Sequence, residues 1–123
     1  MPLAKVSRLR KGVLRLRARS EFERVRCEGQ AWSHRLLVLI ACRNELDVTR
    51  VGVAAGKKLG GAVVRNRAKR LMREAVRQHS ERFKPGWDMV LIARAAIVPV
   101  KLQDVASALE SLLRQADVYR PAE

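Results

Sequence analysis

The side chains that could do chemistry in this sequence are mainly cations, and they gather between Val64 and Arg77. At about 100° per residue of an α-helix, the polar residues of this segment fall within roughly 140° of arc. These residues are Arg65, Asn66, Lys69, Arg70, Arg73 and Arg77. The opposite side of the wheel carries an apolar stripe typical of a core-facing helix, formed by Val64, Ala68, Leu71, Met72 and Ala75. We therefore predict a helix over about residues 62–80 with one basic face.

An ordinary solvated face is the alternative interpretation of this basic face. Such a face would gain from placing an acid four residues before a cation, because these pairs stabilise a helix. Here Arg65, Lys69, Arg73 and Arg77 follow one another at four-residue spacing. Like charges at that spacing cost a few tenths of a kcal/mol per pair. The pattern favours a surface on which phosphates come to lie.

Two further cations, Lys57 and Lys58, stand just before the turn Leu59-Gly60-Gly61 and the start of the predicted helix. The free N–H groups and positive dipole end of a helix N-terminus favour anions. Gly56-Lys57-Lys58 lacks the upstream glycine and the following Ser or Thr of a nucleoside triphosphate loop. We expect phosphates of a polymer here, and no nucleotide triphosphate site.

Residues for direct catalysis are not grouped in the sequence. His34 and His79 are isolated, and Asp47, Asp88 and Asp104 are scattered, each in a place that suits a turn or a helix start. A protein nuclease would need a metal cluster, a general base or a nucleophile. We expect no catalytic residue and no metal site in this chain.

The net charge supports a polyanionic partner. The 123 residues include 26 Lys and Arg against 12 Asp and Glu, a formal charge of +14. The excess comes from residues 1–19 and 48–73, which hold no acid, and single-sign blocks of this kind indicate nucleic acid or, as a competitor, an anionic membrane surface. No apolar run approaches the roughly 20 residues of a membrane span. With no secretory signal and Cys27 and Cys42 interpreted as reduced thiols, we expect a cytoplasmic protein.

The chain predicts one small domain of the α+β class, an α/β sandwich with a small mixed sheet. We expect a flexible basic arm over residues 1–19 and a single RNA-binding domain over residues 20–118. The expected order is α-β-β-β-α-β-α. A capping box starting at Ser20 predicts the first helix. Residues 35–43 and 49–55 predict a hairpin, residues 88–94 a strand, and Pro99 the start of the last helix.

The run Arg65-Asn66-Arg67-Ala68-Lys69-Arg70, followed by Arg73, resembles the signature helix of the bacterial ribonuclease P protein component. Residues 50–53, 57–60 and 88–94 resemble the strands and turn of the same family, and the similarity covers about residues 15–116. The resemblance implies a left-handed β-α-β crossover, against the general rule. It also implies a noncatalytic subunit whose partner RNA hydrolyses the phosphodiester between the 5′ leader and the mature tRNA, using Mg²⁺ held mainly by the RNA, with no organic cofactor.

By this resemblance, the partners are ribonuclease P RNA, in a 1:1 complex, and precursor tRNA, with no membrane. The residues facing the RNA subunit would be Lys57, Lys58, Arg65, Asn66, Arg67, Lys69, Arg70 and Arg73. Phe22 would stack on or pack against a leader base in a cleft between the first helix and the sheet. Arg26 and Ile40 stand where the family often has aromatic residues, which indicates a cleft that relies more on charge. A ribosomal or RNA-assembly binding protein remains the alternative, and a metal-dependent protein nuclease is a third hypothesis.

Overall fold

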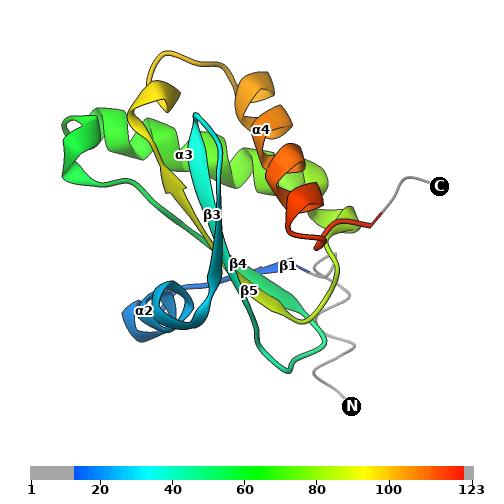
Figure 1. Ribbon diagram of the computed structural model, residues 1–123. Helices are drawn as coiled ribbons and strands as arrows, with labels where there is room; N and C mark the ends of the chain where they lie inside the picture. The colour runs from blue at the N-terminus through cyan, green and yellow to red at the C-terminus, as the bar shows by residue number, and fades with distance from the viewer. Residues whose placement is uncertain (1–12, 121–123) are drawn as a thin grey trace.

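The computed structural model describes residues 13–120, in which five strands form one sheet and three helices cover its two faces. Figure 1 shows helices α3 and α4 on one side of the sheet and α2 on the other. The elements are β1 (Val13–Arg15), α2 (Arg19–Glu28), β2 (Gln30–Ser33), β3 (Leu37–Arg43), β4 (Thr49–Ala54), α3 (Ala62–His79), β5 (Trp87–Ala93) and α4 (Leu102–Gln115). Short 3₁₀ turns cover Lys57–Leu59, Ser80–Arg82 and Ala95–Ile97. No helix in this part of the chain is both long and apolar enough to cross a membrane.

The strands run in the order β1-β4-β5-β3-β2. Strands β1, β4 and β5 are parallel, while β3 pairs antiparallel with β5 and with β2. The predicted hairpin between residues 35–43 and 49–55 is wrong, because β5 lies between these two strands. Residues 89–91 of β5 are all buried, and a strand that is apolar on both faces takes the centre of a sheet rather than an edge. The hairpin partner of β3 is β2.

Alternate residues along the strands supply two cores, as the two-residue period of a strand requires. Met89 and Leu91 of β5 join the larger core beneath α3 and α4. Val90, between them, joins a smaller core with Leu16, Val25 and Cys42 beneath α2. The long helix α3 connects the neighbouring parallel strands β4 and β5. The α+β class and the mixed sheet are confirmed.

The first strand corrects the boundary of the expected arm. Residues 13–15 pair with β4, and the Leu16 backbone N–H donates to the Val51 carbonyl at 3.0 Å. The Leu16 side chain is only 2% exposed and lies in the smaller core. The folded part therefore includes residues 13–19. Leu14 and Leu16 alternate with arginines, a pattern that suits an edge strand. The rest of the expected arm, residues 1–12, lies outside the described residues.

Two predicted helix starts are also shifted. Helix α2 begins at Arg19 after Ala18, without a side-chain cap, so the capping box at Ser20 is wrong. Helix α4 begins at Leu102 rather than at Pro99. There the Asp104 carboxylate accepts a hydrogen bond from the Lys101 N–H at 3.1 Å, which fixes the first turn.

Candidate nucleic-acid interface

Helix α3 separates its apolar and basic residues as the helical wheel predicts. Ala68, Met72 and Ala75 are buried in the larger core. On the other side, Asn66, Arg70 and Arg73 are exposed, whereas Arg65 and Lys69 are half-buried. We call these five residues the basic stripe. The Arg65 Nε is buried and makes no hydrogen bond to any residue in 13–120. This donor therefore has no partner within the described part of the protein.

The entrance to α3 carries the two lysines expected there. Lys57 and Lys58 are exposed on the 3₁₀ turn that precedes the helix. Gly60 follows with φ of 145°, a conformation that favours glycine. Gly61 is the N-cap of α3, and a Cβ added there would meet nothing within 4 Å. The backbone at Gly61, the N-cap of α3, is thus not covered by other atoms, and two exposed lysines precede it in the chain.

Strand β1 adds a cation that the sequence did not place at this surface. Arg15 lines the same cavity as Arg73 of α3, and partial burial together with the Arg15 charge lowers the pKa of Arg73. A cavity of about 320 Å³ lies beside them, and its lining includes Val51, Val53 and Val76 as well as both arginines. The alternation of leucine and arginine in residues 14–17 was the available signal. Two like charges held together favour a polyanion that neutralises both.

The single acid on this side of α3 is already paired. Glu74 forms an ion pair with Arg77 one turn later, and Arg77 Nε donates to Glu74 Oε1 at 3.1 Å. The hydrogen bond from Arg77 lowers the pKa of Glu74. Glu74 thus offsets Arg77 at the end of the helix and leaves the charges from Arg65 to Arg73 unopposed on the stripe.

Arg67 points away from the stripe. Its Nη1 donates to the Val98 carbonyl and its Nη2 to the Val100 carbonyl, each at 2.9 Å. Both acceptors lie in the connection between β5 and α4. Arg67 is the one residue of the expected RNA-facing set whose side-chain nitrogens make hydrogen bonds within residues 13–120.

Of the three residues of the expected leader cleft, Phe22 and Ile40 pack against the same core, and Arg26 does not. The Phe22 ring lies on Gly52 of β4, where an added Cβ would stand 2.3 Å from the ring Cζ. Phe22 and Ile40 both pack against the smaller core, and both remain partly exposed. Arg26 is exposed on α2. Phe22 also lines the cavity that Arg15 and Arg73 line, so this cavity connects the α2 side of the sheet with the basic residues of α3.

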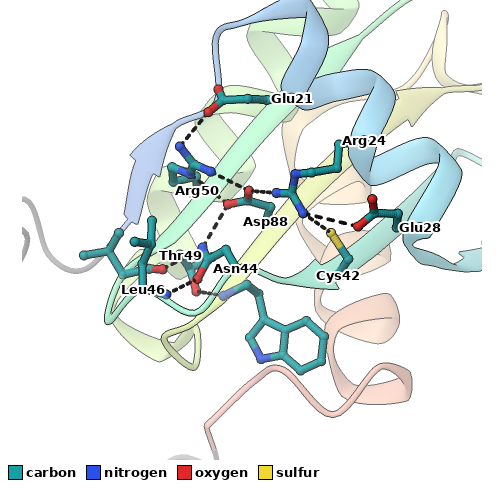
Figure 2. Close-up of polar contacts among 11 residues, drawn as sticks. Glu21, Arg24, Glu28, Cys42, Asn44, Leu46, Thr49, Arg50 and Asp88 are labelled. Atoms are coloured by element: carbon teal, nitrogen blue, oxygen red, sulfur yellow. Dashed lines mark hydrogen bonds and ion pairs between the residues drawn. The ribbon is translucent and has the colours of Figure 1, made fainter.

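An ionic network centred on one buried carboxylate connects α2 to the sheet (Figure 2). Asp88 of β5 is fully buried and forms ion pairs with Arg24 of α2 and Arg50 of β4. Asn44 Nδ2 donates to Asp88 Oδ1 at 2.9 Å, and Arg50 Nη1 reaches Glu21 of α2 at 2.8 Å. The interpretation of Asp88 as a turn or helix-start residue is wrong. Its role depends on partners from three separate elements, which no local pattern reveals.

The network controls the protonation of Asp88 and Cys42. Burial alone would raise the pKa of Asp88, but the hydrogen bonds from Arg50 and Asn44 and the charges of both arginines outweigh it and lower that pKa. Burial raises the pKa of the Cys42 thiol, and Arg24, whose Nη1 lies 3.3 Å from Cys42 Sγ, opposes that shift. The Asp88 carboxylate is therefore held charged inside the fold.

Both histidines take part in hydrogen bonds within the described part of the protein. His79 Nδ1 lies 2.6 Å from the Tyr119 hydroxyl, and its Nε2 lies 3.1 Å from the Ala106 carbonyl. His34 Nδ1 accepts a hydrogen bond from the Leu36 N–H at 3.0 Å. Between residues 13 and 120, no three His, Cys, Asp or Glu side chains form a group that could hold a metal ion.

The fold and this surface define a class: a small α+β protein that presents a basic helix face to a polyanion. A family model described as Ribonuclease P matches residues 11–117. The ribonuclease P protein component of Clostridium botulinum strain Langeland is 42% identical over 106 residues, covering 85% of this chain and 96% of that protein. That of Roseiflexus castenholzii is 41% identical over 113 residues, covering 91% and 93%. The chain belongs to the ribonuclease P protein family.

A solved structure agrees with this assignment. The Staphylococcus aureus RNase P protein superposes with a TM-score of 0.77 at 32% identity, covering 86% of this chain and 97% of that one. The likeness therefore extends over most of this chain.

Proposed function

We propose that this chain is the protein subunit of ribonuclease P and acts in tRNA processing by binding the catalytic RNA of that ribonucleoprotein. The observation that carries the proposal is the basic stripe on α3, continued by Lys57 and Lys58 at the helix entrance and by Arg15 on β1. Phosphate contacts of this kind supply affinity and register without reading sequence. The holoenzyme would be a 1:1 protein–RNA complex in the cytoplasm.

The substrate of this complex would be precursor tRNA. The partly exposed ring of Phe22 offers a face on which a base of the single-stranded 5′ leader can stack. The cavity beside it joins that ring to Arg15 and Arg73, which suits an RNA strand that passes from the sheet face toward α3. Arg26, on the same helix as Phe22, adds a further cation, and Ile40 supplies an apolar wall.

Hydrolysis of the phosphodiester would be the work of the RNA subunit and its Mg²⁺. The exposed cations of the basic stripe support this division, because they suit a protein that binds phosphates of a partner RNA. The protein would act by neutralising phosphates, which lets the RNA fold closely and hold its own Mg²⁺ at modest concentration. A ribosomal or RNA-assembly protein would share the electrostatics and lack any link to cleavage.

Reconstitution separates these functions. Purified chain is mixed with a bacterial ribonuclease P RNA and a precursor tRNA at low Mg²⁺, and leader removal is followed. We expect the chain to increase cleavage and to be inactive without the RNA. No increase would point to the RNA-assembly protein, and cleavage by the chain alone would support a protein nuclease.

Leader recognition is tested separately with Phe22→Ala in the reconstituted complex. Loss of one stacking contact should weaken the binding of precursor tRNA by roughly tenfold, about 1 to 2 kcal/mol. The affinity for mature tRNA should stay nearly unchanged. Equal losses for the two RNAs would remove Phe22 from leader recognition.

A further inference from the structure

Arg67 lies in the middle of the basic sequence run but outside the basic stripe. Arg67 lies two positions after Arg65 on the helix, which rotates its side chain by roughly 200° about the helix axis relative to Arg65. The five residues of the stripe and Arg77 span only about 140° of the same wheel. Arg67 thus leaves α3 in a different direction from its neighbours, toward the connection between β5 and α4.

The Arg67 guanidinium is committed to the backbone of that connection. Its two terminal nitrogens donate to the carbonyls of Val98 and Val100, at 2.9 Å each. A planar guanidinium holds two donors in a fixed fork, and a lysine ammonium offers only a single point of charge. Charged donors also form stronger hydrogen bonds than neutral ones. The side chain therefore joins α3 to a segment more than thirty residues further along the chain.

The connection that Arg67 holds is anchored on its other side as well. Ile97 is fully buried in the larger core, and the Arg94 N–H donates to the Leu36 carbonyl at 2.9 Å. The side of α3 that carries Arg67 is thus attached to a connection that is itself anchored in the fold. A helix tied along one side cannot roll freely about its axis, and the direction in which its other side points becomes fixed.

We propose that Arg67 is a positioning residue, which sets the roll of α3 so that Arg65, Lys69, Arg70 and Arg73 face the RNA together. The basic stripe contacts RNA phosphates, while the Arg67 guanidinium makes its hydrogen bonds within the protein. This proposal rests on the RNA-binding function given above. It assigns to the second arginine of the Arg-Asn-Arg run a role different from that of the first.

Arg70 provides the matched comparison. It is the same residue type on the same helix and it is exposed, and it makes no hydrogen bond or ion pair within residues 13–120. Alanine and lysine substitutions at both positions give four variants. For each, the melting temperature of the free protein is measured by circular dichroism. The Kd for ribonuclease P RNA is measured across a range of KCl at fixed Mg²⁺, at a temperature where every variant is folded.

Each position has its own expected signature. Arg70→Ala should reduce the log–log salt slope by about 0.7 to 0.9, one phosphate contact, and Arg70→Lys should keep it, with melting unchanged in both. Arg67→Ala and Arg67→Lys should both lower the melting temperature by roughly 5 °C. Both should also weaken RNA binding by about threefold to tenfold at an unchanged slope, because the contacts remain but are misaligned.

Three results would count against parts of this account. A smaller slope with Arg67→Ala that Arg67→Lys restores would make Arg67 a phosphate contact and overturn the proposal. Lower melting with unchanged RNA affinity would reduce Arg67 to a purely structural tie and overturn it as well. An unchanged slope with Arg70→Ala would instead undermine the RNA-binding stripe itself, whatever Arg67 does. If Arg67→Ala fails to fold, Arg67→Gln, which keeps an uncharged amide donor, replaces it in the same comparison.

Discussion

Arg50 of β4 grips both oxygens of Asp88 on the neighbouring strand β5, with Nε 2.8 Å from Oδ1 and Nη2 2.6 Å from Oδ2. Its third nitrogen holds Glu21 of α2. Arg50 therefore belongs to the protein interior, although it stands in the sequence block whose charge points to RNA. Arg24 is engaged with the same carboxylate from the other side. The net charge of the chain overstates the number of cations offered to a partner.

Loss of the Asp88 charge should destabilise the fold strongly. Asp88→Asn leaves Arg24 and Arg50 partly buried without their shared carboxylate, so we expect a loss of about 2 to 4 kcal/mol in the free energy of unfolding. Urea denaturation measures it. Asp47→Asn, at an exposed position, is the control and should change stability by no more than about 0.5 kcal/mol. A loss at Asp88 no larger than that at Asp47 would show that the network contributes little.

The same carboxylate should make stability depend on pH. The pKa of Asp88 is lowered in the folded protein, so its contribution is fully present above the unfolded pKa of about 3.9 and is lost as pH falls through the folded value. Thermal melting from pH 7 to pH 2 should show the gap between the native protein and Asp88→Asn narrowing only below about pH 4. A gap that is constant across this range would contradict the lowered pKa.

Gly52→Ala should disturb the contact between α2 and the sheet. The new methyl group would stand 2.3 Å from Phe22 Cζ, so the ring must move, and overpacking of this kind costs about 1 to 3 kcal/mol. Gly56→Ala is the control, because a Cβ there meets nothing within 4 Å. Urea denaturation compares the two variants. Adding Phe22→Leu to Gly52→Ala should recover part of the loss, and a lack of any recovery would place the clash elsewhere.

Arg15→Ala should remove one phosphate contact from the RNA-binding surface. Because Arg15 lies beside Arg73 and both line the same cavity, we expect the salt slope of RNA binding to fall by about 0.7 to 0.9. Arg35→Ala, an exposed arginine in the turn between β2 and β3, serves as control and should leave the slope unchanged. Equal slopes for Arg15→Ala and the native protein would confine the interface to α3 and its entrance.

The sequence predicted α3 well because its signal is local. The spacing of Ala68, Met72 and Ala75 reports directly which side of a helix is buried, and the stripe opposite follows from the same geometry. The position of β5 between β3 and β4 could not be predicted in this way. Apolar runs indicate strands but do not say which strands pair, so the hairpin was assigned to neighbours in sequence.

In the candidate site, too, the sequence predicted features that depend on local helix geometry and missed those that depend on partners distant in the chain. The outward direction of Arg65, Lys69 and Arg70 follows from the wheel, whereas the inward partners of Arg67 depend on where the β5–α4 connection lies. Asp88 was misinterpreted because a buried carboxylate is recognised by its partners, which come from β4, α2 and the turn at Asn44. Phe22 and Ile40 share one core, which their separation in sequence does not show.

The central place of β5 has a consequence for synthesis of the chain. Strands β3 and β4 are made before β5, yet neither has its inner neighbour until the ribosome has added residue 93. A nascent chain that ends before Trp87 lacks the strand that joins the two halves of the sheet. Its earlier strands would present unpaired edges and apolar faces, the surfaces that chaperones bind. The domain is therefore expected to fold late, when at least three-quarters of its sequence has left the ribosome.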